Sequence, residues 1–353
     1  MSITKHLKSA AAAIALTLGA SQVQAADPEF TFKLHHFLPP PSMAHAQFLK
    51  PWAEKVMAES DGRIKIELYP AMQLGGKPPA LFDQARRGIV DISWTVGGYT
   101  PGRFPKATAF ELPFMATNAK ALSMAIQDYA EQEMQEELKD VHLLAMHAHA
   151  PGSLHSRDKQ IKTAADLEGM KLRAPNKTMA AAFSALGANP VFMPVPQMPS
   201  ALSKGVLDVA VLPYEVVKPL KIHQLVKHHT EIPGDRGLYA QFFIFSMNKD
   251  SYEKLPADLK KVIDNNSGIE LAGHIGDLFD QSELVGKKAA VDQGNSIYAL
   301  DEAEVAKWQS DLKFVTEDWI EDMKSDGHDA DHLLKLANSL IEKYEQIEQT
   351  ASK

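Results

Sequence analysis

The sequence predicts an α/β protein of two lobes, with a ligand cleft between the lobes and a long helix that crosses both. Apolar runs with strand periodicity alternate with segments of helical spacing up to Ala150, and the same alternation restarts after it. Strands separated by helices of this length favour parallel sheets covered on both faces. The length of the chain suggests two domains of ordinary size.

The individual elements follow from apolar periodicity and from the Gly and Pro residues that end each run. In the first unit, strands are expected at 31–37, 63–70, 89–96 and 141–150, and helices at 44–60, 78–88 and 119–140. In the second unit, strands are expected at 171–174, 189–193 and 207–213, and helices at 178–187 and 198–205.

The stretch from Pro256 to Gln293 has helical spacing throughout. As one helix it would extend ~55 Å at 1.5 Å per residue, which exceeds one small domain. We therefore expect a helix, broken near Gly273 or Gly276, that lies across both lobes, and a final amphipathic helix from Asp329. Residues 26–149 with about 238–275 are expected to form lobe I, and 150–237 with about 276–353 lobe II.

The N-terminus has the pattern of an export signal. Lys5 and Lys8 precede an apolar run at 10–20, and Val23-Gln24-Ala25 fits a signal-peptidase site. The run is too short for the ~20 residues of a membrane span. We expect residues 1–25 to be a signal peptide cleaved near Ala25, and the mature protein to be exported to a compartment such as the periplasm.

Composition narrows the class of partner. The chain has no cysteine, and at 353 residues it can bury enough core without disulfides. It carries 37 basic and 45 acidic residues, and removal of Lys5 and Lys8 leaves 35 − 45 = −10 for the mature part. Nucleic acid and anionic membrane surfaces are therefore excluded as expected partners.

Five motifs occur in a fixed order along almost the whole mature chain. They are "ELYPAMQLGG", "RRGIVDIS", "ELPFM", "DLEGMKLRAPNKTMAAAFSALGANPVFMPVPQMPSALSKGVLD" and "FSMNKDSYEKLPADLKKVID".

With these motifs the sequence resembles the DctP-like solute-binding proteins of tripartite ATP-independent periplasmic (TRAP) transporters. The resemblance implies a two-lobed periplasmic-binding-protein fold that closes on a small organic acid. It also implies delivery of that acid to a sodium-driven membrane permease, with no cofactor. We expect a monomer.

The resemblance places Arg173 on the residue that grips the ligand carboxylate. A guanidinium offers two parallel N–H donors that match the two carboxylate oxygens, and burial strengthens both bonds. The alternative is a structural ion pair with Asp166 or Glu168.

Departures from the family pattern indicate the ligand. The turn that carries a second Arg in many members reads "HAHAPGSLHS", with His149 near its start. Val195 stands where an aromatic residue is common, and Leu212 where an Asn is common. A pocket this apolar favours a monocarboxylate with an apolar or aromatic body over a sugar acid. A C4-dicarboxylate remains an alternative, and it would need a second cation from Arg103, Lys77 or Arg236.

Aromatic residues could form the body of the pocket. Trp94 and Tyr99 follow an apolar strand, Tyr214 follows Leu212-Pro213, and Phe242 lies in "YAQFFIFSMN". Open α/β sheets bind ligands beyond the carboxyl ends of strands, so Tyr99 and Tyr214 are favoured.

A metal-binding transport protein and an enzyme are the alternatives to an organic-acid-binding protein. A metal-binding transport protein would use the histidines of "HAHAPGSLH" and "HQLVKHH", but zinc needs three or four converging ligands, and we expect no metal. An enzyme is not expected, because GxSxG, HExxH, a cysteine nucleophile and a Gly-rich phosphate loop are all missing from the sequence.

Overall fold

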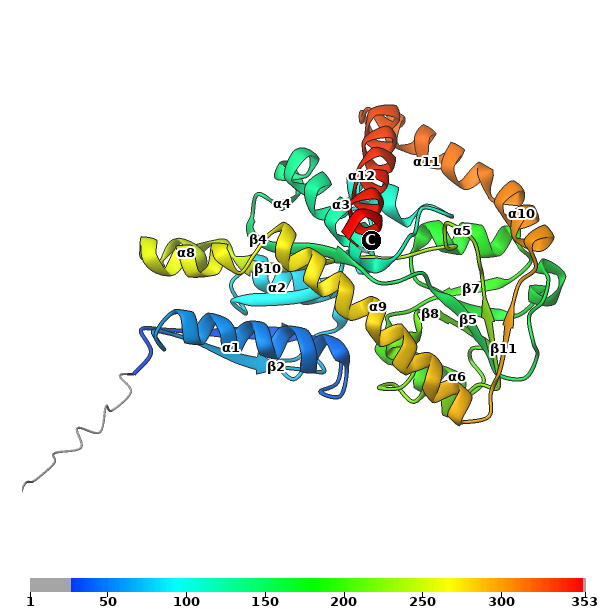
Figure 1. Cartoon of the computed structure of the whole chain (residues 1–353), viewed down its shortest axis with the longest axis horizontal. Helices are drawn as coiled ribbons and strands as arrows, with labels where there is room; N and C mark the ends of the chain where they lie inside the picture. Colours follow the sequence, from blue (N-terminus) through cyan, green and yellow to red (C-terminus); the bar gives the residue numbers. More distant parts are fainter. Residues whose placement is uncertain (1–26, 352–353) are drawn as a thin grey trace, which may run out of the picture.

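The computed structural model describes residues 27–351, and the expected signal peptide lies outside them. Within these residues the chain forms two sheets, each covered by helices (Figure 1). The first is five-stranded with the order β2-β1-β3-β10-β4. Its strands are β1 Phe30–His36, β2 Ile64–Tyr69, β3 Ile92–Val96, β4 Val141–Ala148 and β10 Phe242–Asn248.

The second sheet is six-stranded with the order β11-β9-β5-β8-β6-β7. Its strands are β5 Ser153–Ser156, β6 Lys171–Ala174, β7 Asn189–Phe192, β8 Val209–Leu212, β9 His228–Glu231 and β11 Ser296–Ala299.

The expectation of purely parallel sheets was wrong, because both sheets are mixed. β10 pairs antiparallel with β3 and β4, and β5 pairs antiparallel with β8 and β9. The cause is that the chain passes between the sheets as extended segments, from β4 to β5 and from β9 to β10. A strand entered directly from the other sheet needs no helical crossover, so it can run against its neighbours.

The helices cover both sheets, and none within residues 27–351 is both long and apolar enough to cross a membrane. Helix α1 is preceded by a π-helical turn at Ala44–Leu49. The helices are α1 Lys50–Glu59, α2 Leu81–Arg86, α3 Ala119–Glu133, α4 Gln135–Leu138, α5 Lys177–Ala185, α6 Met198–Ser203, α7 Lys249–Glu253, α8 Ala257–Asn265, α9 Ile269–Asp292, α10 Glu302–Asp311, α11 Lys313–Ser325 and α12 Ala330–Ala351.

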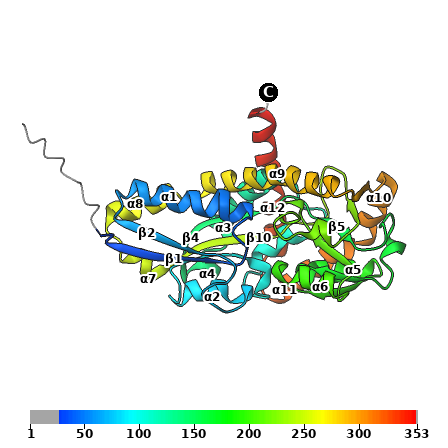
Figure 2. The same ribbon diagram turned by 90° about the horizontal axis from the view of Figure 1, so that it is seen from below.

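Helix α9 lies along one face of the molecule and spans both sheets (Figure 2). The expected long helix is therefore confirmed, but its break is elsewhere. The chain interrupts the helix before Ile269, where Gly268 has φ +78° and its N–H donates to Leu144 O at 2.7 Å. The helix then runs without a break through Gly273 and Gly276.

Two half-buried acidic side chains attach α9 to both lobes. Asp280 accepts hydrogen bonds from the N–H groups of Ala119 (2.8 Å) and Lys120 (3.0 Å), at the start of α3. Glu283 accepts from the N–H groups of Tyr214 (3.0 Å) and Glu215 (2.8 Å), in the second lobe. Each carboxylate satisfies two N–H groups that no helix bond would satisfy.

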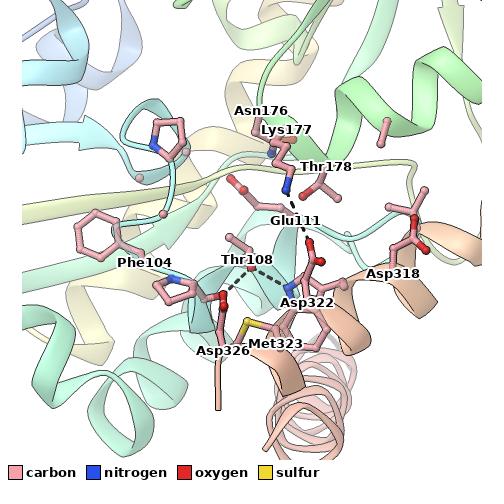
Figure 3. A pocket seen from close by; sticks show the side chains of 18 of the residues that line it. Phe104, Thr108, Glu111, Asn176, Lys177, Thr178, Asp318, Asp322, Met323 and Asp326 are labelled. Carbon is pink, nitrogen blue, oxygen red and sulfur yellow. Dashed lines mark hydrogen bonds and ion pairs between the residues drawn. The ribbon is translucent and has the colours of Figure 1, made fainter. Parts of the chain in front are cut away.

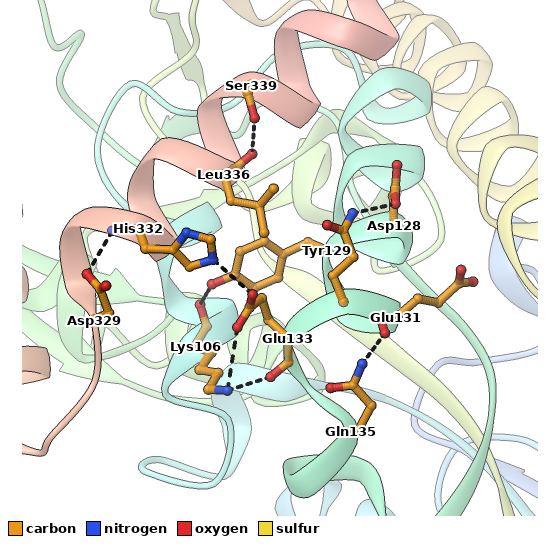
Figure 4. Close-up of polar contacts among 11 residues, drawn as sticks. Lys106, Asp128, Tyr129, Glu131, Glu133, Gln135, Asp329, His332, Leu336 and Ser339 are labelled. Atoms are coloured by element: carbon orange, nitrogen blue, oxygen red, sulfur yellow. Dashed lines mark hydrogen bonds and ion pairs between the residues drawn. The ribbon is translucent and has the colours of Figure 1, made fainter.

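The C-terminal helix α12 packs on α3, which in turn packs on β4 of the first sheet. His332 Nε2 lies 2.9 Å from Glu133 Oε1, and Glu133 O accepts from Lys106 Nζ at 2.6 Å (Figure 4). Asp128 accepts from Lys343 Nζ and from the Tyr344 hydroxyl, each at 2.8 Å.

Glycines set the distance of α9 from both lobes. A Cβ at Gly276 would lie 2.5 Å from Ala119 O, and one at Gly286 would lie 1.8 Å from Tyr214 O. We expect Gly276→Ala and Gly286→Ala each to lower the free energy of unfolding by about 1–3 kcal/mol or more, because backbone must move. Thermal unfolding measures this.

Gly273→Ala is the matched control on the same helix. Its Cβ would meet the flexible side chain of Met124, with Sδ at 3.1 Å, and Ala favours a helix by up to about 1 kcal/mol. A loss as large as that of the other two variants would contradict the role of backbone contact.

Candidate functional site

Arg173, on β6, is fully buried in the second lobe. Its Nε donates to Met193 O at 3.1 Å and its Nη1 donates to Val211 O at 2.7 Å. Its Nη2 is also buried, and within residues 27–351 it has no hydrogen-bond partner. The two carbonyls come from the segments that flank β6 in the sheet, so they fix the plane of the guanidinium and leave one nitrogen to donate.

A structural ion pair does not explain this arginine. Asp166 instead pairs with Lys159 at 2.9 Å and caps the turn that begins at Thr163. Within the described chain, no ion pair joins Arg173 to Asp166, Glu168 or any other acid. A buried charge without a counter-ion is costly, which is typical of a site that binds one.

Two tyrosines lie beside the guanidinium. Burial raises the pKa of Tyr99, and the positive charge of Arg173 opposes this rise; the pKa of Tyr239 responds in the same way. Both phenols therefore stay neutral and keep a proton to donate. The hydroxyl of Tyr239 is buried and has no partner among the described residues. A carboxylate at Nη2 would thus meet further O–H donors.

Tyr99 also connects the two lobes. It lies in the turn Gly97–Tyr99 that follows β3, and its hydroxyl accepts a hydrogen bond from the N–H of Val195 at 3.0 Å. Val195 begins the turn after β7 in the other sheet. The structure is therefore in a closed form, with this bond crossing the cleft.

Aromatic rings form the wall on the first-lobe side. Phe37 stacks on Trp94 with ring centroids 5.0 Å apart, and Trp94 stacks on Phe243 at 4.9 Å. Phe37 also meets the edge of Tyr99 at 5.7 Å. Trp94 Nε1 donates to His147 Nε2 at 2.8 Å, so the indole presents only its apolar face to the site.

His149 contributes no charge here. Its Nδ1 donates to Ala150 O at 2.5 Å, and its Nε2 accepts from the N–H of Gln241 at 3.1 Å. Burial lowers the pKa of His149 to about 4, so the ring is neutral. Since both nitrogens are used by the backbone, His149 shapes the site without gripping a ligand.

Of the other residues predicted to bind the ligand, Val195 and Leu212 lie near Arg173, whereas Tyr214 and Phe242 pack elsewhere. Val195 and Leu212 flank the carbonyls that bind Arg173, but Tyr214 lies deeper, edge-on to His155 with centroids 5.0 Å apart. Phe242 lies on the opposite side of β10 from Phe243, where it packs on Phe104 at 6.2 Å.

Two of the three candidates for a second cation, Arg103 and Arg236, pair with acidic side chains instead. Arg103 Nη2 lies 3.7 Å from Asp140 Oδ2, and its guanidinium lies over the ring of Phe82. Arg236 pairs with Glu345 at 2.8 Å. Both arginines already have acidic partners at the surface.

Sequence reasoning missed Tyr239 and Phe37. Tyr239 follows a Gly-Leu pair just before β10, and a Cβ at Gly152 would lie 2.1 Å from its ring. In the sequence, Pro151-Gly152 is the only sign of a close contact for Tyr239, and the position directly after the first strand is the only sign for Phe37. Neither sign is specific for a binding site.

His155 and His229, from the two histidine-rich segments, pack as a buried neutral pair. No cluster of metal-ligating residues occurs in the part of the chain that the structure describes. His155 Nε2 donates to Leu212 O at 2.9 Å, so its Nδ1 must accept from His229 Nδ1 at 2.5 Å. His229 Nε2 then accepts from the amide of Asn295 at 3.0 Å. Every nitrogen of the pair is used in one consistent direction.

This pair predicts a loss of stability in acid. Burial lowers the pKa of His155 to about 4 and that of His229 to about 2, whereas an unfolded His titrates near 6.5. The folded state binds fewer protons, so stability is full above about pH 6.5 and falls as the pH drops toward 4. The slope reaches at most about 1.4 kcal/mol per pH unit for each His.

Thermal unfolding from pH 7.5 to 4.5 measures that slope. His228→Gln, at the half-buried neighbour of His229, is the control, and it should change the slope less than the double variant does. His155→Phe with His229→Leu should reduce the slope, and the part that remains belongs to other buried histidines, such as His147 and His149, whose pKa values burial also lowers. A double variant with the wild-type slope would contradict the assignment.

Two α/β lobes closed on a buried arginine and aromatic rings define a solute-binding protein. Residues 34–322 match the family described as bacterial extracellular solute-binding protein, family 7, and the chain belongs to that family. The predicted resemblance to DctP-like TRAP solute-binding proteins is confirmed, and so is the two-lobed α/β fold. The class is periplasmic.

Solved structures of the class are similar over nearly the whole chain. A marine metagenome TRAP solute-binding protein specific for aromatic acid ligands, in complex with 3-hydroxybenzoate, is 49% identical with a TM-score of 0.88, over 90% of this chain and 99% of that one. One from Rhodoferax ferrireducens T118, with copurified benzoate, is 46% identical with a TM-score of 0.88 over the same shares. A third, from Bordetella bronchiseptica with bound mandelate, is 29% identical with a TM-score of 0.81, over 89% and 99%.

Proposed function

We propose that this protein captures an aromatic monocarboxylate in the periplasm and delivers it to a TRAP membrane permease. The unpaired Nη2 of Arg173, buried beside aromatic rings, carries the proposal. The ring-bearing acids bound by the relatives support it, since those chains are 46% and 49% identical to this one.

The chemistry of the site favours one carboxylate on an apolar body. Arg173 supplies the charge and Tyr239 a neutral hydroxyl donor, whereas Phe37 and Trp94 offer ring faces. His149 is neutral and Arg103 is paired elsewhere, so a second carboxylate would be buried without a counter-ion. The geometry therefore disfavours a C4-dicarboxylate.

Capture works by lobe closure. Arg173 belongs to the second lobe and the aromatic wall to the first, so a ligand that touches both lowers the free energy of the closed form. The bond from Val195 to the Tyr99 hydroxyl forms only when the lobes meet. We further propose that the protein acts as a monomer, without catalysis, after cleavage of a signal peptide near Ala25.

A panel of ligands tests the class of solute. We expect benzoate and 3-hydroxybenzoate to raise the melting temperature, by an amount equivalent to about 2.7 kcal/mol at a hundredfold excess over Kd. Benzamide and benzyl alcohol match the ring but lack the charge, and should have far smaller effects. Tighter binding of succinate or glucuronate than of either aromatic acid, measured by calorimetry, would overturn the proposal.

Replacement of Arg173 tests whether its guanidinium binds the ligand carboxylate. Arg173→Ala should weaken benzoate binding by about 2–5 kcal/mol, roughly 30-fold to several thousandfold. It should also lower the melting temperature of the free protein, because Met193 O and Val211 O each lose a donor. Arg173→Lys should rescue binding only in part, since an ammonium cannot reproduce the fork.

Arg103→Ala is the matched control, because this arginine has an acidic partner at the surface. It should leave the Kd for benzoate unchanged. If Arg173→Ala binds benzoate within threefold of wild type, the arginine is not the ligand-binding residue.

A further inference from the structure

A pocket lies between the lobes, apart from the buried Arg173 site (Figure 3). Its volume is about 400 Å³, within the range of small-molecule sites. The first lobe contributes the segment from Gly97 to Glu111 together with Phe242, and the second lobe contributes the start of α5. Helix α11 closes the remaining side. We call this the outer pocket.

The outer pocket and the Arg173 site are built from the same three segments. Along the turn after β3, Gly98 lines the outer pocket and Tyr99 faces Arg173. On β10, Phe242 lines the outer pocket and its neighbour Phe243 belongs to the aromatic wall. After β6, Asn176 lines the outer pocket. The two sites therefore lie back to back.

The lining of the outer pocket is acidic. Lys177 is its only basic residue, and it lies 3.6 Å from Asp322. Within residues 27–351, Asp318, Glu321 and Asp326 have no ion-pair partner. The lining has five acids, which are Glu111, Asp318, Glu321, Asp322 and Asp326.

Its apolar part is aromatic. Phe104 and Phe242 lie on one side, and Trp319 on the other. Trp319 Nε1 donates to Thr108 Oγ1 at 2.7 Å, so the indole is held in place and its nitrogen is satisfied. Aromatic faces attract cations as well as apolar groups.

Glu111 is the feature that points to a ligand. Its side chain is only 1% exposed, yet Oε1 is buried without a hydrogen-bond partner in the described chain. The amide nitrogen of Asn176, 4% exposed, likewise makes no hydrogen bond of good geometry, although the Asn176 side chain lies close enough to Glu111 to oppose the rise in its pKa. Burial raises the pKa of Glu111 to about 8, so the free carboxyl is largely protonated below that pH, and a cation bound beside it would favour its anionic form. Nothing in the acid-binding site uses this carboxyl, and leaving it unpaired costs free energy.

We propose that the outer pocket binds a small amphipathic organic cation, with an ammonium group at Glu111 and an aromatic or apolar body against Phe242 and Trp319. The acidic rim attracts the charge, and the aromatic rings hold the body. Because both lobes line the pocket, the bound cation stabilises the closed form.

Benzylammonium is the probe, and benzyl alcohol is its neutral match. We expect calorimetry to detect benzylammonium binding to the wild-type protein and to find much weaker binding of benzyl alcohol. Glu111→Gln keeps the shape of the side chain but cannot become an anion, so it should weaken benzylammonium binding by about tenfold or more. Equal binding of the two probes, or no detectable binding, would overturn the proposal.

Glu215→Gln is the matched control. Glu215 is another buried acid with an unpartnered oxygen, but it lies outside the outer pocket, so its replacement should leave the affinity unchanged. If Glu111→Gln does not fold, the double variant Asp318→Asn with Asp326→Asn, at the exposed rim, tests the proposal instead. Its affinity for benzylammonium should fall by about threefold to tenfold. Unchanged affinity in the Glu111 variant, or in this rim variant, would contradict a cation site.

The benzylammonium titration contains no carboxylate ligand, so its result does not depend on whether the protein binds an aromatic acid. Arg173→Lys should bind benzylammonium like wild type. A loss there would mean that the probe occupies the Arg173 site, and would overturn the assignment to the outer pocket.

Discussion

The burial of one guanidinium without a counter-ion is the constraint on which this site depends. Arg173 gives two of its nitrogens to Met193 O and Val211 O, which hold its plane but do not neutralise its charge. Neutral partners cannot compensate a buried charge as an anion does. We propose that a carboxylate at Nη2 would supply the missing negative charge and so stabilise the closed form.

Helix α9 makes that arrangement possible in a two-lobed molecule. Asp280 binds the start of α3 in the first lobe, and Glu283 binds the N–H groups of Tyr214 and Glu215 in the second. Burial raises the pKa of Asp280 to about 6 and that of Glu283 to about 8, and the backbone N–H groups oppose both rises. The hydrogen bonds of Asp280 and Glu283 therefore hold both lobes against the same helix in the closed form.

The family motifs singled out Arg173, whose role in ligand binding stays a prediction. Periodicity and spacing were enough to predict the strands and helices with strong apolar patterns. They were not enough for β5, β9 and β11, which have four residues each and carry His or polar side chains inside a sheet. The sequence also does not reveal which acidic side chain pairs with a given Arg or Lys. Arg103 was a candidate cation until the structure placed it beside Asp140, and Tyr239 became visible only through its contact with Gly152.

We propose that the neutral groups around Arg173 make its single charge selective for the ligand. The buried His147 and His149 lie on the strand that leads out of the first lobe, and burial lowers the pKa of His147 to about 3 and that of His149 to about 4. Burial raises the pKa of Tyr99, so it too is uncharged. An anion with one carboxylate meets a matched charge there, whereas each further charge on the solute would have to be buried against neutral groups. A pocket built in this way discriminates by the number of charges on the ligand as much as by its shape.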